Sequence, residues 1–272
     1  MAQCLLDAPS STNQPSLTGW THGLQSPPLA AGDVHVWRAV IDEARSVVRE
    51  EADVLSEAEW RQAERLRIEA RRCQFVQGRV VLRRILARYA GVAPRDLRLA
   101  AGAYGKPFVC DPPVARRLRF NFAHSHGLAL CAVTLDRDVG VDLERIRSLA
   151  GADLIARHCF STCEQRVLEG LPPDQRLNAF WTGWTLKESY VKARGDGLRV
   201  PLGSFDVSLT PGQARLIRVA AAPGEPSRWQ LHSLQPADEY VGAVAVEHGG
   251  RRIATWHACD ARCTSDDCGG RR

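Results

Sequence analysis

The hydrophobic pattern divides the chain into two halves, each mixing helix and strand. In the first half, alternation over 35–41 predicts a strand, a long apolar stripe over 57–90 predicts one helix, and the apolar run 128–135 predicts a buried strand. In the second half, the same criteria predict a helix over 180–193 and strands over 139–144, 205–209, 229–234 and 240–246. Residues 107–113, bounded by prolines, are expected to form a loop.

The order of these elements is similar in the two halves. In each, a long helix precedes strands, and the half ends in an apolar strand of small residues, 128–133 or 241–246. We therefore predict an α+β fold of two similar halves about a pseudo-two-fold axis. The expected bounds are a flexible leader (1–31), an N-terminal half (32–137), a C-terminal half (138–248) and a Gly-, Arg- and Cys-rich tail (249–272).

Composition indicates a globular protein of the cytoplasm. The 272 residues are 44% hydrophobic and 25% charged, which suits a soluble domain with a sizeable core. The longest apolar run is too short to span a bilayer, and the first basic residue is Arg38, so we expect neither a membrane segment nor a secretory signal. Nine irregularly spaced cysteines favour reduced thiols, with Cys159 and Cys163 structural. The net charge of +5 suits an anionic ligand or an acidic partner.

Lysine is rare, because only three of the 36 basic residues are lysines: Lys106, Lys187 and Lys192. A GC-rich genome also produces such an arginine bias. However, the broad guanidinium does not replace a compact ammonium faithfully, so the remaining lysines mark positions where a point charge is needed.

Residues 139–144, Val-Gly-Val-Asp-Leu-Glu, are the first candidate site. On a strand, Gly140, Asp142 and Glu144 share one face. Two carboxylates beside a glycine that leaves room are typical of a site for a hard cation. The alternative is a solvated face of an edge strand.

Residues 184–192 are the second candidate site. On a helix, Trp184, Glu188 and Lys192 share a face. An ordinary surface ion pair would have the same spacing, but the tryptophan places the pair beside bulky, buried surface. A carboxylate there needs a cation, which a metal shared with Asp142 and Glu144 would supply.

Together, these segments resemble the two signature motifs of the phosphopantetheinyl transferase superfamily, one ending at Asp142 and one running from Trp184 to Lys192. Three further segments resemble elements of its larger, Sfp-type branch: Gly105-Lys106-Pro107, 120–125 (Phe-Asn-Phe-Ala-His-Ser) and 158–164, which ends at Glu164. The resemblance covers about 35–247. Ala123 stands where this family usually has serine, so a hydroxyl contact to a coenzyme A phosphate is expected to be lost or replaced.

The resemblance implies an activity and its site residues. The enzyme would move the 4′-phosphopantetheine group of coenzyme A onto a serine of an apo acyl or peptidyl carrier protein and release 3′,5′-ADP. Mg²⁺ would be held by Asp142, Glu144 and Glu188. The remaining roles fall to three catalytic residues and to the side chains expected on the nucleotide phosphates. Glu164, or a hydroxide on the metal, would accept the serine proton. Lys192, with Lys187 nearby, would stabilise the leaving phosphate. The phosphates of coenzyme A would be held by Lys106, His124 and one arginine of the helix face that carries Arg72, Arg79 and Arg83.

Other functions stay open at this point. A non-catalytic relative that binds coenzyme A or carrier proteins would share these motifs. A basic nucleic-acid-binding module agrees with the pI of about 8.8 but leaves the acidic cluster unexplained, so we expect no nucleic acid partner. Zinc at His124 and His126, or at the tail residues His257, Cys259, Cys263 and Cys268, matches no common spacing. Because each half supplies part of the site, we expect a monomer. The carrier could serve fatty-acid synthesis or a secondary metabolite pathway.

Overall fold

The computed structural model describes residues 19–22, 28–41, 53–149, 151–210, 212–249 and 252–258. Most of the predicted leader and the end of the predicted tail lie outside these residues. The elements before residue 139 are β1 (Thr21–His22), β2 (Asp33–Val40), α1 (Glu57–Glu64), α2 (Glu69–Ala90), β3 (Arg98–Ala101), β4 (Pro107–Asp111), β5 (Leu118–Ser125) and β6 (Leu128–Leu135). The remainder comprises β7 (Val139–Arg145), α3 (Ala152–Cys159), α4 (Thr162–Gly170), α5 (Pro173–Arg194), β8 (Phe205–Val207), β9 (Leu216–Val219), α6 (Glu225–Arg228), β10 (Trp229–Leu234), β11 (Tyr240–Glu247) and β12 (Arg252–His257).

The two halves repeat one topology, which confirms the predicted α+β fold of similar halves. Each runs strand, long helix, two-stranded hairpin and two further strands: β2-α2-β3-β4-β5-β6, then β7-α5-β8-β9-β10-β11. The last strand of each half is an inner strand of its sheet. Thus β6 pairs antiparallel with β2 and β5, and β11 pairs antiparallel with β7 and β10.

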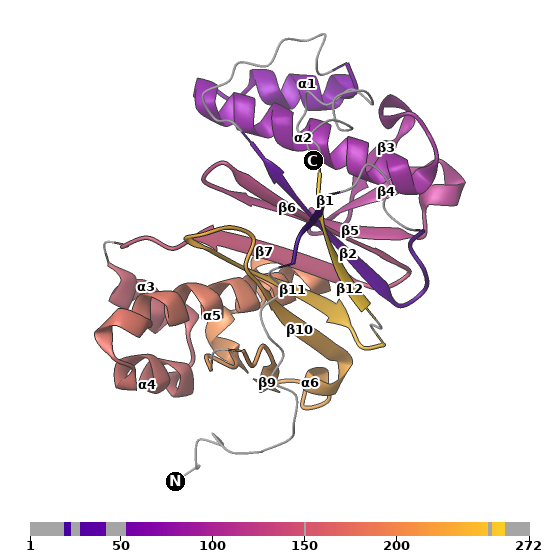
Figure 1. Ribbon diagram of the computed structural model, residues 1–272. Helices are drawn as coiled ribbons and strands as arrows, with labels where there is room; N and C mark the ends of the chain where they lie inside the picture. The colour runs from indigo at the N-terminus through magenta and orange to yellow at the C-terminus, as the bar shows by residue number, and fades with distance from the viewer. Residues whose placement is uncertain are drawn as a thin grey trace.

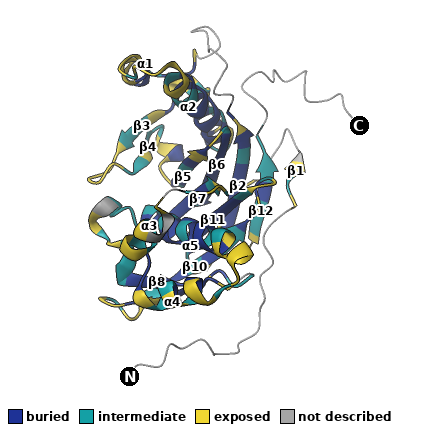
Figure 2. Cartoon of the chain, turned by 90° about the vertical axis from the view of Figure 1, so that its left-hand side faces the viewer, coloured by how far each residue is buried: buried dark blue, intermediate teal, exposed yellow. Residues whose placement is uncertain are grey.

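The halves stack as layers, with helix α2 above one sheet and helix α5 below the other (Figure 1). Between the sheets lies a core to which both contribute: Val34, Val36, Ala123, Leu128, Leu130 and Ala132 from the first, and Val139, Val141, Leu143, Leu234, Val244 and Val246 from the second. The central strands are accordingly buried, whereas α3 and α4 turn exposed surface outward (Figure 2). This shared core holds the two halves in one fixed arrangement.

Side chains bridge the halves where β5 runs beside β7. The Asn121 side-chain oxygen accepts a hydrogen bond from the Val141 amide at 2.9 Å. The Ser125 hydroxyl oxygen accepts one from the Arg145 amide at 3.4 Å. These bonds satisfy amides of an edge strand that would otherwise lack partners. They also fix residues 120–125 of β5 against β7.

The prediction of a single helix over 57–90 is wrong, because this segment forms two helices, α1 and α2. Helix α1 ends at Glu64, and Ile68, in extended conformation, precedes α2. No glycine or proline marks this break. Its physical cause is tertiary: α1 folds back on α2, burying Ala63 against Val76 and Val80, and its Glu59 pairs with the buried Arg83 at 2.8 Å.

Three segments expected to be irregular contain strands. The predicted leader contains β1, which pairs parallel with β12. The predicted loop at 107–113 begins with β4, which pairs with β3 as a hairpin. The predicted tail contains β12, which pairs parallel with β2 and so extends the sheet of the first half. Strand pairing across the molecule decides all three, and the local sequence does not reveal it.

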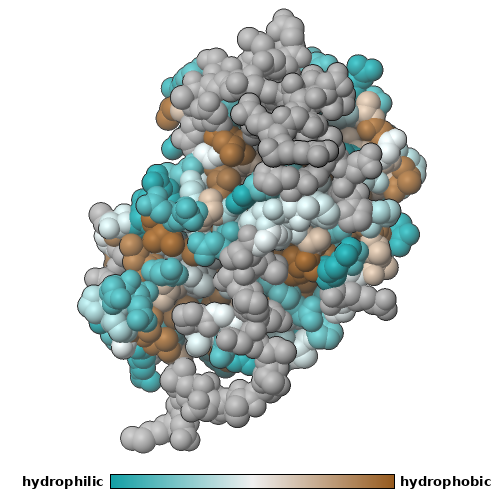
Figure 3. Space-filling view, viewed as in Figure 1, coloured by the Kyte–Doolittle hydropathy of each residue, from teal (hydrophilic) through white to brown (hydrophobic). Residues whose placement is uncertain are grey.

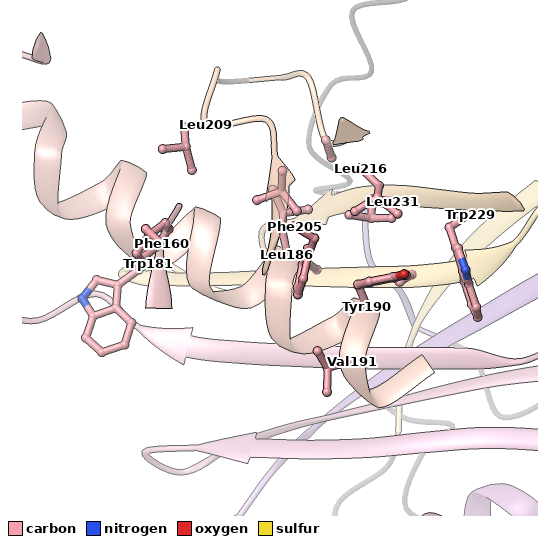
Figure 4. Close-up of a cluster of buried hydrophobic side chains, with 14 of the residues drawn as sticks. Phe160, Trp181, Leu186, Tyr190, Val191, Phe205, Leu209, Leu216, Trp229 and Leu231 are labelled. Atoms are coloured by element: carbon pink, nitrogen blue, oxygen red, sulfur yellow. The ribbon is translucent and has the colours of Figure 1, made fainter. Parts of the chain in front are cut away.

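Helix α5 is the best anchored element of the second half. It begins with Pro173 at its first position and ends at Gly195, which adopts the left-handed conformation (φ +73°) that favours glycine. The helix packs in a large apolar cluster with Tyr190, Phe205 and Trp229 at its centre (Figure 4). It starts seven residues before the predicted position and ends at the predicted turn.

Gly140 lets α5 approach β7 closely. A Cβ atom there would lie 2.1 Å from the Ser189 carbonyl oxygen and 2.3 Å from the Ala193 amide nitrogen. Both are backbone atoms, so no side-chain rotation relieves the clash. We expect Gly140→Ala to lower the free energy of unfolding by about 3 kcal/mol, as in severe overpacking.

Urea unfolding followed by circular dichroism measures this loss. Gly170→Ala is the matched control, because nothing lies within 4 Å of the Cβ position at Gly170. Equal stability of the two variants would contradict the close approach of α5 and β7.

The surface of the described residues mixes polar and apolar side chains. On the face drawn in Figure 3, hydrophobic residues form small patches between hydrophilic ones. In the part of the chain that the structure describes, none of the helices combines the length and hydrophobicity needed to cross a bilayer.

Candidate active site

The acidic residues meet where β7 packs on α5. As predicted, Val139, Val141 and Leu143 enter the core between the sheets, and Asp142 lies on the face of β7 that meets α5. Lys192 of α5 donates to Asp142 Oδ1 at 2.6 Å. Glu144 accepts a hydrogen bond from the Ser125 hydroxyl at 2.7 Å.

Burial makes this cluster electrostatically unusual. It raises the pKa of Asp142 to about 7, with Lys192 opposing the rise and the neighbouring Glu144 and Glu188 adding to it. Burial also raises the pKa of Glu188, and Glu144 adds to this rise. Three carboxylates that influence one another in a buried place favour binding of a cation.

A divalent cation suits these residues chemically. Asp142 Oδ2 is buried, with no hydrogen-bond partner among the described residues. A hard cation such as Mg²⁺ prefers carboxylate oxygens. As the side chains stand, however, no three acidic, histidine or cysteine side chains of the described residues form a ready-made metal cluster. Lys192 and Ser125 already bind oxygens of Asp142 and Glu144.

A cavity of about 450 Å³ joins the two halves at this point. Its walls include Lys106 and Pro107 of the first half and Glu188, Val191 and Lys192 of α5. Two of the three lysines and one carboxylate of the cluster thus face the same space. The prediction that both halves contribute to one site agrees with this cavity.

Lys106 is held at the end of α5. Its ammonium donates to the Ala193 carbonyl at 2.5 Å and to Asp138 at 3.3 Å. Burial lowers the pKa of Lys106, while Asp138 opposes the decrease. The C-terminal end of a helix carries partial negative charge, which an ammonium stabilises.

His124 and Ala123 point in different directions from β5. His124 is exposed near the end of the strand, one residue before the Ser125 that binds Glu144. Ala123 is buried in the core between the sheets. A side chain at 123 therefore faces the packed interior.

The arginines of α2 have separate environments. Arg83 is only 2% exposed and donates to Glu59 and to two backbone carbonyls, so it supports the fold. Arg79 lies over the Phe75 ring and lines a groove of about 1,210 Å³ shared with Gly105 and Pro107. Arg72 is exposed and pairs with Glu69. Arg83 also lines this groove, but its donors are taken up by Glu59 and the two carbonyls, which leaves Arg79 as the candidate ligand beside Gly105 and Pro107.

Glu164 and Lys187 form a buried ion pair. Their charged groups are 2.8 Å apart, and the side chains are 3% and 0% exposed. Glu164 also accepts bonds from the Ser161 and Val207 amides, each at 2.8 Å. Lys187 donates to the Leu202 and Phe205 carbonyls at 2.8 and 2.7 Å. Neither residue lines the cavity, although Leu202 does.

Comparison with known proteins identifies the family of this chain. A family model described as the 4′-phosphopantetheinyl transferase superfamily matches residues 138–245. The 4′-phosphopantetheinyl transferase HetI of Nostoc sp. is 36% identical over 237 residues, which cover 86% of this chain and 97% of the relative. The chain belongs to the 4′-phosphopantetheinyl transferase family.

Other members of the family match shorter stretches. The 4′-phosphopantetheinyl transferase Sfp of Bacillus subtilis is 33% identical over 132 residues, covering 48% of this chain and 56% of the relative. The AcpT enzyme of Salmonella typhimurium is 35% identical over 126 residues, covering 46% and 60%. The predicted resemblance to the family, Sfp-type members included, is confirmed.

Two residues that connect the halves were not singled out from the sequence. Asn121 and Ser125 bond to β7, and Ser125 also holds Glu144. A signal for them exists, because residues four apart on a strand share a face. For the alternative zinc sites, His124 and His126 belong to no metal cluster of the described residues, and Cys259, Cys263 and Cys268 lie outside these residues. Neither Cys159 nor Cys163 forms a disulfide among the described residues.

Proposed function

We propose that the protein transfers the 4′-phosphopantetheine group of coenzyme A to a serine of apo carrier proteins and requires Mg²⁺ to do so. The observation that carries this proposal is the cavity between the halves. It brings Lys106 and Lys192 together with Glu188, next to the buried Asp142. Cations for phosphates and carboxylates for a metal then face one space, as phosphoryl transfer requires.

The reaction exchanges a phosphoanhydride bond of coenzyme A for a phosphoester bond to the carrier. The serine oxygen of the carrier forms a bond to the β-phosphorus of coenzyme A. The bond from that phosphorus to the bridging oxygen breaks, and 3′,5′-ADP leaves with the electron pair. The serine proton passes to a base. Mg²⁺, when bound, neutralises charge on the pyrophosphate.

Each side chain of the site has one role in this reaction. Asp142, Glu144 and Glu188 would hold Mg²⁺. Lys192 donates to the leaving phosphate from the cavity wall. The remaining side chains bind the nucleotide end: Lys106, His124 and Arg79, with Arg72 at the outer end of the same helix.

We assign Glu164 and Lys187 a positioning role. Glu164 accepts three hydrogen bonds or ion-pair contacts inside the protein, so it has little capacity left for a serine proton. Lys187 instead fixes the backbone at Leu202, a residue of the cavity wall. The base is then another group at the site.

The partners follow from the same chemistry. Carrier domains of acyl, peptidyl or aryl type would supply the serine. A mildly basic protein suits an acidic carrier, since opposite charges favour encounter. We further propose that it acts as a monomer in the cytoplasm, because both halves of the site come from one chain.

Lys192→Arg tests whether the shape of the ammonium matters. A solvated surface lysine would tolerate arginine within about 0.5 kcal/mol of stability. In the cavity, the wider guanidinium cannot occupy the same place beside Asp142 and the phosphate. We expect the transfer rate to fall about 10-fold or more, equivalent to one poorly placed charge-assisted hydrogen bond.

Steady-state kinetics with a carrier substrate measure this change. Arg61→Lys, on the exposed surface of α1, serves as the control and should leave the rate unchanged. Full activity of Lys192→Arg would remove Lys192 from the catalytic residues.

Incubation with Mg²⁺, coenzyme A and several apo-carriers tests the function itself. A carrier that gains one phosphopantetheine supports it. Tight, Mg²⁺-dependent binding of coenzyme A without transfer would point to a non-catalytic relative.

A further inference from the structure

Lys192 is placed to exchange between two partners. Its ammonium lies 2.6 Å from Asp142 Oδ1, and its side chain also lines the cavity between the halves. The side chain is 31% exposed, so it is not locked into the interior. Among the described residues, Lys192 is the only basic side chain in an ion pair with Asp142, Glu144 or Glu188.

The carboxylate cluster favours a nearby positive charge, because Asp142 is buried and Glu144 and Glu188 beside it are half-buried. Buried carboxylates without a counter-charge are strongly destabilising. Lys192 supplies one positive charge to the cluster and leaves Asp142 Oδ2 without a partner. The cluster is therefore only partly compensated while Lys192 is its sole cation.

A divalent cation competes with the Lys192 ammonium for Asp142. Oδ2 lacks a partner, but the ammonium holds Oδ1 of the same carboxylate at 2.6 Å. Two positive charges at such short range repel. Binding of the cation therefore weakens the contact between Lys192 and Asp142 and favours movement of the ammonium into the cavity.

We propose that Lys192 is an internal counter-ion that a divalent cation displaces from Asp142 into the cavity. Before the cation binds, the ammonium keeps the carboxylate cluster compensated. Once displaced, it faces the space where the phosphates bind. Lys192 thus couples cation binding to phosphate binding, and each ligand strengthens the other by the same factor. The inference rests on the metal assignment within the proposed function, but its test needs neither coenzyme A nor a carrier protein.

The scarcity of lysine makes the exchange directly observable. Protein labelled with ¹⁵N-lysine gives ammonium signals from only Lys106, Lys187 and Lys192, and single Lys→Arg variants assign them. We expect saturating Mg²⁺ to shift or broaden the Lys192 signal. The Lys187 signal should stay in place, because the Lys187 side chain is 0% exposed, does not line the cavity, and is held by Glu164 and the Leu202 and Phe205 carbonyls.

Cation affinity gives an independent readout. Removing the competing ammonium in Lys192→Met should tighten Mn²⁺ binding, measured by electron paramagnetic resonance at pH 8.5 under nitrogen, by at least about 5-fold. Arg228→Met is the matched control, since it removes one positive charge from a surface pair with Glu247 and should leave the affinity unchanged.

The outcomes separate this inference from the function. An unmoved Lys192 signal at saturating Mg²⁺, or Mn²⁺ affinity that is unchanged or weaker in Lys192→Met, overturns the exchange even if the protein transfers phosphopantetheine. A moved signal with tighter Mn²⁺ binding supports it even if no transfer is detected. Absence of any cation binding overturns both the exchange and the metal assignment.

Discussion

Replacing Glu188 by glutamine is expected to lower the transfer rate by about 10²–10⁴-fold while leaving the fold intact. The substitution removes one of three negative charges from the proposed metal site and keeps the side-chain shape. Lost metal stabilisation of the pyrophosphate is worth several kcal/mol, which sets this range. Because burial raises the pKa of Glu188 and Glu144 adds to the rise, the neutral amide should not destabilise the metal-free protein.

Turnover measured over a range of Mg²⁺ concentrations checks this prediction. The variant should need more Mg²⁺ and still react slowly when saturated. Glu169→Gln, an exposed residue of α4, is the charge-matched control. Near-normal turnover and unchanged Mg²⁺ dependence in Glu188→Gln would show that this carboxylate holds no metal.

The second large effect concerns stability. Lys187→Met should lower the free energy of unfolding by about 3–5 kcal/mol, because it leaves Glu164 charged and buried without its partner. The Leu202 and Phe205 carbonyls also lose their donor. Glu164→Met should cost a comparable amount, because it leaves Lys187 charged and buried without its partner. The double variant Glu164→Met/Lys187→Met should recover part of the loss, since no isolated charge remains.

Chemical unfolding of the four proteins gives this double-mutant cycle. The pH dependence of kcat/KM separates positioning from proton transfer. If Glu164 only positions the cavity wall, the folded Glu164→Gln variant keeps the wild-type pH profile at a reduced rate. Wild-type stability combined with a lost ionisation in that profile would instead identify Glu164 as the base.

The core elements of both halves could be read from the sequence because their signals are local. The strands at 128–135 and 229–234 coincide with the observed ones, since a continuous apolar run predicts the first and mixed apolar and polar residues of strand type predict the second. The end of α5 was also predictable, because Gly195 is a strong stop signal. The break between α1 and α2 has no such signal: it depends on the Glu59–Arg83 pair, whose members are far apart in the chain.

The residues of the candidate site could be predicted from the sequence, but their hydrogen-bond and ion-pair partners could not. Strand alternation placed Asp142 with Glu144 on one face of β7, and helical spacing placed Lys192 with Glu188 on one face of α5. Spacing alone does not reveal which donor each carboxylate has. The hydrogen bond from Ser125 to Glu144 and the ion pair between Lys187 and Glu164 arise from packing between distant segments.

The most direct test of the account is the intact mass of an apo-carrier protein after incubation with this protein, coenzyme A and Mg²⁺. The account predicts that the carrier gains the mass of one phosphopantetheine, that one equivalent of 3′,5′-ADP appears, and that a carrier with its acceptor serine replaced by alanine gains nothing. The gain should also disappear when a chelator removes the divalent cation. Unchanged masses for acyl, peptidyl and aryl carriers alike, with a folded protein that binds coenzyme A, would contradict it.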